Sequence, residues 1–137
     1  SLDIDVRTLP GQTAEEVEEM LDDALGDLRD SVDLEIVKSE PSSASAVDTP
    51  LWDTLDRVTK AFYAGSHLVP MLSVGATDAR FFRRLGTTSY GFGLFSEKLT
   101  FEDFGRMFHG DDERVDVESL HLSTELWQAV ARDLLVS

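Results

Sequence analysis

The sequence predicts an α/β fold, in which a β-α-β unit, half of a ferredoxin-like domain, precedes a strand–helix–strand–helix segment. Three observations lead to this prediction. Apolar and polar residues alternate in two short segments near the N-terminus, a capped amphipathic helix pattern lies between them, and apolar runs then alternate with helical patterns that end at glycine. Strand, helix and strand in that order are typical of a parallel α/β sheet.

The β-α-β unit occupies the first 40 residues. Residues 2–7 alternate apolar and charged side chains, as a half-buried strand does. Thr13 and Glu16 form a capping-box pattern, which predicts a helix from Ala14 to about Leu28. Residues 32–37 repeat the alternation and predict a second strand beside the first.

A segment of proline and small residues at positions 41–45 predicts a linker between two domains. The predicted domains are therefore residues 1–40 and residues 41–137. The elements expected after the linker are a helix from Thr49–Pro50 to near Gly65, a strand at residues 69–74, a helix from Asp78 to Leu85 that Gly86 ends, a strand at residues 87–95, and a helix from Val117 to Leu135.

The composition limits the partners. Lys and Arg total 12 against 27 Asp and Glu, which gives a formal net charge of −15. Such a surface repels phosphate backbones and anionic lipids, so neither a nucleic acid nor a membrane is an expected partner. The chain has no Cys, so a metal site must use His, Asp or Glu, and a cytoplasmic location is expected.

The sequence contains no run long enough to span a membrane and no signal-peptide pattern at its start. Its first residues already follow the strand pattern, with no segment leading into it. We therefore expect the chain to be a fragment of a longer protein.

His109 is the first candidate site residue. It precedes Gly110 in a loop that continues Asp-Asp-Glu-Arg, and a neutral imidazole beside glycine can ligate a metal. The alternative is a solvated acidic loop that happens to contain a histidine.

The second candidate site is the segment from Gly75 through Ala76 to Arg80, at a strand-to-helix junction where α/β sheets tend to bind ligands. Arg80 can bind a carboxylate through two nitrogens, or it can be an exposed residue after an ordinary helix cap. Arg7, at the end of the first predicted strand, is by itself most simply a solvated side chain. We interpret His67 and His121 as structural or solvated.

Three motifs in this order resemble one family of dizinc hydrolases, which includes aminoacylase, carboxypeptidase G, acetylornithine deacetylase and succinyl-diaminopimelate desuccinylase. The motifs are LDIDVRTLPG before a capped acidic helix, SVGATDARFF, and MFHGDDERVDVESL. They extend over essentially the whole chain. The first is similar to the second half of the family's lid domain, and the other two are similar to motifs of the C-terminal part of its catalytic domain.

The resemblance implies an enzyme that hydrolyses an amide bond in an acylated amino acid or a small peptide with a free carboxylate. It implies two zinc ions, with cobalt as a possible substitute, and places His109 as the last zinc ligand. It implies that Arg7 and Arg80 bind the substrate carboxylate and that Gly75 and Ala76 line the same pocket. It also implies a homodimer formed through the lid.

The sequence departs from the family pattern at Val74, Ala76 and Asp112, where Gly, Thr and Asn are common in the family. The family's other zinc ligands and its general base would lie upstream of residue 1. We therefore expect no catalytic residue in this chain, no activity of the chain alone, and no retained zinc. The alternatives are a non-catalytic acidic dimerisation or interaction module, and a small acidic binding domain whose motifs match by chance.

Overall fold

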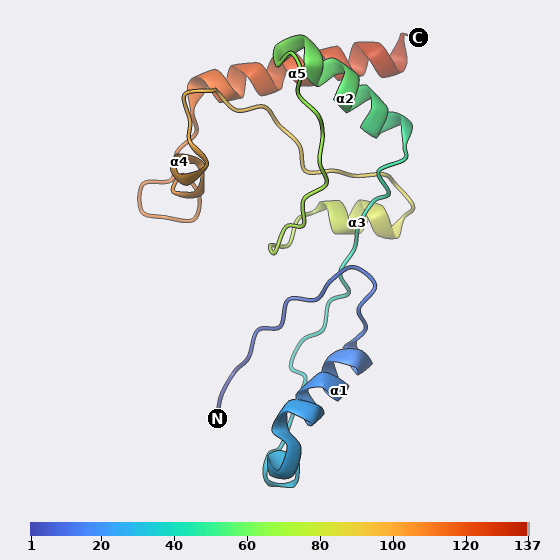
Figure 1. The fold of residues 1–137 in the computed structure, drawn as a ribbon, viewed down its shortest axis with the longest axis vertical. Coiled ribbons are helices and arrows are strands. Elements are labelled where there is room, and N and C mark those ends of the chain that lie inside the picture. Colours follow the sequence, from blue (N-terminus) through green and yellow to red (C-terminus); the bar gives the residue numbers. More distant parts are fainter. Residues whose placement is uncertain (137) are drawn as a thin grey trace. The chain divides into compact units, whose positions relative to one another are not determined.

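The computed structural model describes residues 1–136, and all regular secondary structure in that range is helical. The elements, in chain order, are α1 (Ala14–Leu25), η1 (Gly26–Ser31), α2 (Pro50–Phe62), α3 (Ala79–Arg84), α4 (Phe101–Gly105) and α5 (Val117–Leu135) (Figure 1). None of the helices in the described range is long and apolar enough to cross a membrane.

The chain forms two compact units. Unit 1 comprises Ser1–Ser45 and Leu72–Ser89, and it contains α1, η1 and α3. Unit 2 comprises Ala46–Met71 and the described residues from Tyr90 onward, and it contains α2, α4 and α5. The division into domains 1–40 and 41–137 stays a prediction.

The predicted α/β fold class is wrong for this chain. No strand or sheet occurs among residues 1–136, so the β-α-β half of a ferredoxin-like domain is also wrong. The segments that were predicted as strands, and that have no regular structure, are residues 2–7, 32–37, 69–74 and 87–95. Alternation of apolar and polar residues indicates which face of a strand would be apolar. The strand itself forms only if its N–H and C=O groups can hydrogen-bond to an adjacent strand. In unit 1 no such ladder forms, and Leu2 and Ile4 are 82% and 61% exposed.

The predicted helices are confirmed, because the signals for helices are local. The Glu16 amide donates to Thr13 Oγ1 at 3.2 Å and the Thr13 amide donates to Glu16 Oε2 at 2.9 Å, which completes the capping box of α1. At the start of α2, the Trp52 amide donates to Thr49 Oγ1 at 3.2 Å, and Pro50 occupies the first turn of the helix. Gly86 follows α3 with a φ of 80°, a conformation that glycine adopts without strain.

The serine-rich segment at residues 41–45 makes specific contacts within unit 1, although its composition predicted a linker. Arg83 on α3 donates from Nη1 to the carbonyl of Ser43 at 3.3 Å and from Nε to Ser45 Oγ at 3.3 Å. Its Nη2 donates to the carbonyl of Ser89 at 2.7 Å. One guanidinium therefore joins three chain segments of unit 1.

The hydrophobic core of unit 2 lies between α2 and α5, which lie side by side (Figure 1). Leu55 and Leu126 are fully buried, and Leu94 and Val130 are 4% and 3% exposed. Partly buried apolar and aromatic side chains surround these four, among them Leu51, Val58, Phe62, Tyr90, Phe92 and Leu122. The apolar stripe of each helix thus finds its partner in the other helix.

Residues 94–96 run along α5 without joining a sheet. Ser123 Oγ accepts from the amide of Leu94 at 3.0 Å and donates to the carbonyl of Leu94 at 2.9 Å, and Ser119 Oγ accepts from the amide of Ser96 at 2.9 Å. Ser119 and Ser123 lie one helical turn apart on α5, so they hydrogen-bond to alternate residues, 96 and 94, of the segment. They replace the neighbouring strand that the sequence pattern predicted.

An ion pair adds a pH-dependent link between the two helices of unit 2. Asp133 on α5 accepts from Arg57 and, at 3.0 Å, from Thr54 Oγ1 on α2. The hydrogen bond from Arg57 first, and then that from Thr54, hold the pKa of Asp133 below its ordinary value. A depressed folded-state pKa stabilises the fold above the unfolded-state pKa, and this stabilisation is lost as the pH falls through the folded-state pKa.

We therefore expect Asp133→Asn to lower the melting temperature at pH 7 and to have a smaller effect at pH 2.5, because the contribution of the ion pair is lost as the pH falls through the depressed pKa of Asp133. Circular dichroism at 222 nm during heating measures both proteins at both pH values. Because each comparison is made at one pH, the change in overall charge on acidification affects both proteins alike. An equal difference at the two pH values would contradict the role of this ion pair.

Candidate functional site

Unit 1 brings together two of the motifs that the sequence singled out. Nη1 of Arg7 donates to the carbonyl of Val74 at 3.0 Å, although 67 residues separate the two. Nη2 of Arg7 pairs with Asp5, and the Arg7 side chain is 58% exposed. The turn that follows Val74 contains Gly75, whose amide donates to Ser73 Oγ at 3.3 Å, and Ala76, which is exposed. Arg7 thus lies against the predicted turn, with its charge toward solvent.

Arg80 lies in the first turn of α3, in the same unit. Its Nη1 pairs with the carboxylate of Glu40, and the two side chains are 28% and 35% exposed. The guanidinium carbon lies 4.8 Å from the centre of the Phe81 ring. The Nε atom of Arg80 is buried and has no hydrogen-bond partner among the described residues. The guanidinium therefore keeps hydrogen-bonding capacity that residues 1–136 do not use.

His109 lies in unit 2, in the loop between α4 and α5, and the structure describes it separately from the two arginines. It is exposed and has a φ of 54°, the left-handed region that few non-glycine residues adopt. The amide of Arg114 donates to the carbonyl of Met107 at 3.2 Å and closes the loop around it. Uncommon backbone conformations of this kind concentrate at functional sites, which supports a role for His109.

A pocket of about 320 Å³ lies beside the His109 loop in unit 2. Phe104 packs edge to face against Phe95 and Phe108, with ring centres 4.3 Å and 4.5 Å apart. The residues that line the pocket are Phe95, Leu99, Phe104, Met107, Phe108, Glu113, Arg114, Val115, Asp116 and Ser119. Its wall is therefore mainly apolar, and three charged residues, Glu113, Arg114 and Asp116, form part of it.

This pocket was not expected from the sequence, because helix α4 was not predicted. The sequence nevertheless contains a local signal for this helix. Thr100 and Asp103 form a second capping box, in which the Asp103 amide donates to Thr100 Oγ1 at 3.1 Å. Phenylalanine at positions 101, 104 and 108 also follows helical spacing.

The described residues do not make a zinc site by themselves. Within residues 1–136 no group of three His, Asp or Glu side chains is gathered so that it could hold a metal ion. A zinc site normally takes three or four protein ligands. The exposed imidazole of His109 suits one ligand position, and the rest of a site would have to come from other residues.

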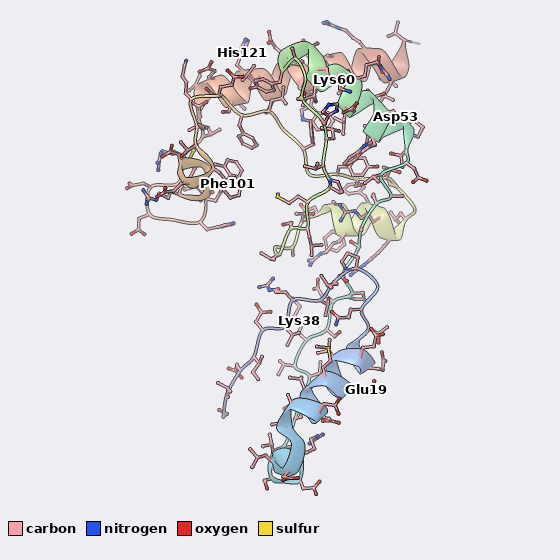
Figure 2. The ribbon with its side chains drawn as sticks, viewed as in Figure 1. Glu19, Lys38, Asp53, Lys60, Phe101 and His121 are labelled. Atoms are coloured by element: carbon pink, nitrogen blue, oxygen red, sulfur yellow. The ribbon has the colours of Figure 1, made fainter. Side chains whose placement is uncertain are left out.

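The other two histidines belong to unit 2. His121 lies on α5 (Figure 2), its side chain is 70% exposed, and its Nε2 lies 3.4 Å from Glu125 Oε1. This agrees with the expectation that it lies off the buried face of the helix. His67 lies near Asp56, whose pKa is lowered mainly by a hydrogen bond from Lys60.

Comparison with known proteins extends these observations. The model of the family described as Peptidase family M20/M25/M40 matches residues 4–133. A protein of Xenopus tropicalis described as N-fatty-acyl-amino acid synthase/hydrolase PM20D1 is 30% identical over 126 residues, which is 90% of this chain and 24% of the relative. The chain thus spans about a quarter of the length of this curated relative. No solved structure shows a significant match to the chain.

Proposed function

The chain belongs to peptidase family M20/M25/M40, and from that premise we propose that it is the C-terminal part of a longer zinc-dependent amidohydrolase. In this proposal the longer enzyme hydrolyses the amide bond of an acylated amino acid or a small peptide with a free carboxylate. The printed name of the Xenopus relative, an N-fatty-acyl-amino acid synthase/hydrolase, supports an acylated amino acid as the substrate.

The observation that carries the proposal is the contact between Arg7 and the turn at Gly75. Two motifs far apart in the sequence meet in unit 1, through the hydrogen bond from Arg7 to Val74. Arg80, six residues from that carbonyl along the chain, belongs to the same unit. Guanidinium groups bind carboxylates well, so we assign Arg7 and Arg80 to the substrate carboxylate and Gly75 and Ala76 to the pocket wall.

We assign His109 as one metal ligand. Zinc bound there, with ligands from the rest of the longer protein, would polarise the amide carbonyl and activate water. Residues 1–40 would belong to a lid domain and residues 41–137 to the catalytic domain. We further propose a homodimer, because apolar side chains of unit 1 such as Leu2, Met20 and Val37 are at least 60% exposed.

The test is turnover by the longer protein of N-acyl amino acids that differ in acyl length. Each substrate is paired with its carboxamide, which keeps the scissile bond and removes the carboxylate charge. We expect hydrolysis of the carboxylate form, loss of activity with a chelator, and slower turnover of the carboxamide. If the metal-loaded longer protein hydrolyses none of these substrates, the chain is instead part of a non-catalytic interaction module.

Arg80→Lys gives a sharper prediction within the same assay. Lysine keeps the positive charge but cannot form two parallel hydrogen bonds to one carboxylate, so kcat/KM should fall by roughly one to two orders of magnitude. Bound zinc should be unchanged, which elemental analysis of the purified protein measures. The matched control is Arg84→Lys on the same helix, which should leave kcat/KM near that of the unaltered enzyme. Equal losses from the two variants would remove Arg80 from the site.

A further inference from the structure

We propose that Glu40 is a resident carboxylate that occupies Arg80 in place of the substrate's carboxylate and so sets how tightly carboxylate ligands bind. The inference rests on the proposed function in one respect, the assignment of Arg80 to the substrate carboxylate. It adds that Glu40, which no motif singled out, determines affinity at that position.

The geometry of the ion pair supports this role. Glu40 and Arg80 are 40 residues apart in sequence and both belong to unit 1. Their contact uses a single guanidinium nitrogen, Nη1, while the buried Nε has no partner among the described residues. A guanidinium can bind a carboxylate through two parallel hydrogen bonds. Glu40 therefore neutralises Arg80 without making the strongest contact that the guanidinium allows.

Lys38 provides an alternative partner for Glu40. Its Nζ lies 3.2 Å from Glu40 Oε1, the oxygen that Arg80 does not contact, and its side chain is 76% exposed (Figure 2). The hydrogen bond from Lys38 is the largest influence that lowers the pKa of Glu40, and the nearby charge of Arg80 adds to it. Glu40 therefore stays ionised at neutral pH and competes for Arg80 throughout the neutral range.

Replacement of Glu40 by another carboxylate at Arg80 therefore has a small electrostatic free-energy cost. When a ligand carboxylate binds Arg80, Glu40 remains beside Lys38 and is partly exposed to water. Neither Arg80 nor Glu40 is then left buried and unpaired. A ligand without a negative charge gains nothing from displacing Glu40. The pair thus favours ligands that carry a carboxylate, at a moderate cost in affinity for them.

The first experiment uses the chain itself and needs no catalysis. Arg80 is observed through its side-chain Nε–H resonance in the ¹⁵N-labelled protein, and Arg80→Lys identifies that resonance by removing it. Sodium acetate is then added at constant ionic strength. Because partly exposed ion pairs are weak, we expect Glu40→Gln to lower the acetate concentration at half-saturation by about two- to fivefold. An unchanged or higher concentration would overturn the proposal.

The matched control is Asp22→Asn, which removes the carboxylate partner of Arg29 in another ion pair of unit 1. It changes the net charge by the same amount but should leave the acetate titration of Arg80 unchanged. If it lowers the half-saturating concentration as much as Glu40→Gln does, the effect comes from overall charge and the proposal fails.

The second experiment uses the longer hydrolase. Glu40→Gln should lower KM for an N-acyl amino acid by a similar factor, leave kcat near its original value, and leave KM for the carboxamide unchanged. If Glu40 only held Arg80 in position, the same change would raise KM for the carboxylate substrate. A positive acetate titration with no hydrolysis would instead refute the proposed function and leave the competition between Glu40 and acetate intact.

Discussion

His109→Ala in the longer hydrolase should lower turnover by several orders of magnitude and reduce the bound zinc. His109 is exposed, lies in a loop with a left-handed backbone at that residue, and is the candidate metal ligand of this chain. Loss of one ligand from a site of three or four weakens metal binding, and the metal supplies both carbonyl polarisation and water activation. Elemental analysis and steady-state kinetics on the same preparation measure the two effects.

The control is His121→Ala, which removes another exposed imidazole from the same unit. His121 pairs loosely with Glu125 one helical turn away, so its loss should leave zinc content and rate unchanged. We would abandon the assignment if His109→Ala kept its zinc and a near-normal rate, or if His121→Ala were the more damaging change. Because the zinc measurement does not depend on catalysis, it tests the ligand assignment even if the substrate class is wrong.

Helices could be predicted from this sequence because their signals lie within a few residues of one another. The capping box at Thr13, the Thr49–Pro50 start and the glycine after α3 each act within one or two turns. Helix α5 begins and ends at the predicted residues, Val117 and Leu135. Helix α4 has the same kind of signal at Thr100, so its omission reflects the short length of the helix and not a missing pattern.

Strands could not be predicted reliably, because a strand depends on partners that the local pattern does not encode. At residues 94–96 the backbone does find partners, but they are the hydroxyl groups of Ser119 and Ser123 on α5. Gly93 is part of that arrangement, since a Cβ there would lie 3.2 Å from Ser123 Oγ. No alternation of apolar and polar residues indicates that two helical serines will take the place of a strand.

The candidate site likewise contains residues that could be found from the sequence and residues that could not. The motifs singled out Arg7, the turn at Gly75, Arg80 and His109, and the structure brings Arg7 to that turn within unit 1. Their roles stay predictions. Glu40 could not have been found from the sequence, because nothing near it in the chain indicates that it meets a guanidinium 40 residues away. The apolar pocket beside His109 likewise depends on the packing of the Phe104 ring against the rings of Phe95 and Phe108, which the sequence does not show.

The stability of unit 2 depends chiefly on the small core between α2 and α5. In the part of the chain that the structure describes, four hydrophobic residues form its buried cluster, and two of them, Leu55 on α2 and Leu126 on α5, have no exposed surface. Removing methyl and methylene groups from such a place costs their transfer free energy and also leaves a cavity, because close-packed neighbours relax only in part. A core of this size has few other contacts to compensate for that loss.

Leu126→Ala should therefore lower the free energy of unfolding by about 2–5 kcal/mol, enough to unfold much of unit 2 if its stability is at the low end for small domains. Urea titration followed by tryptophan fluorescence measures this change, because Trp52 on α2 and Trp127 on α5 report on the two helices that enclose the core. The matched control, Leu135→Ala, removes the same atoms from the same helix at a side chain that is 82% exposed, and should change the free energy by less than about 0.5 kcal/mol. Equal effects of the two substitutions would show that α5 does not bury Leu126 against α2, and the packing of unit 2 that presents the His109 loop would then have to be revised.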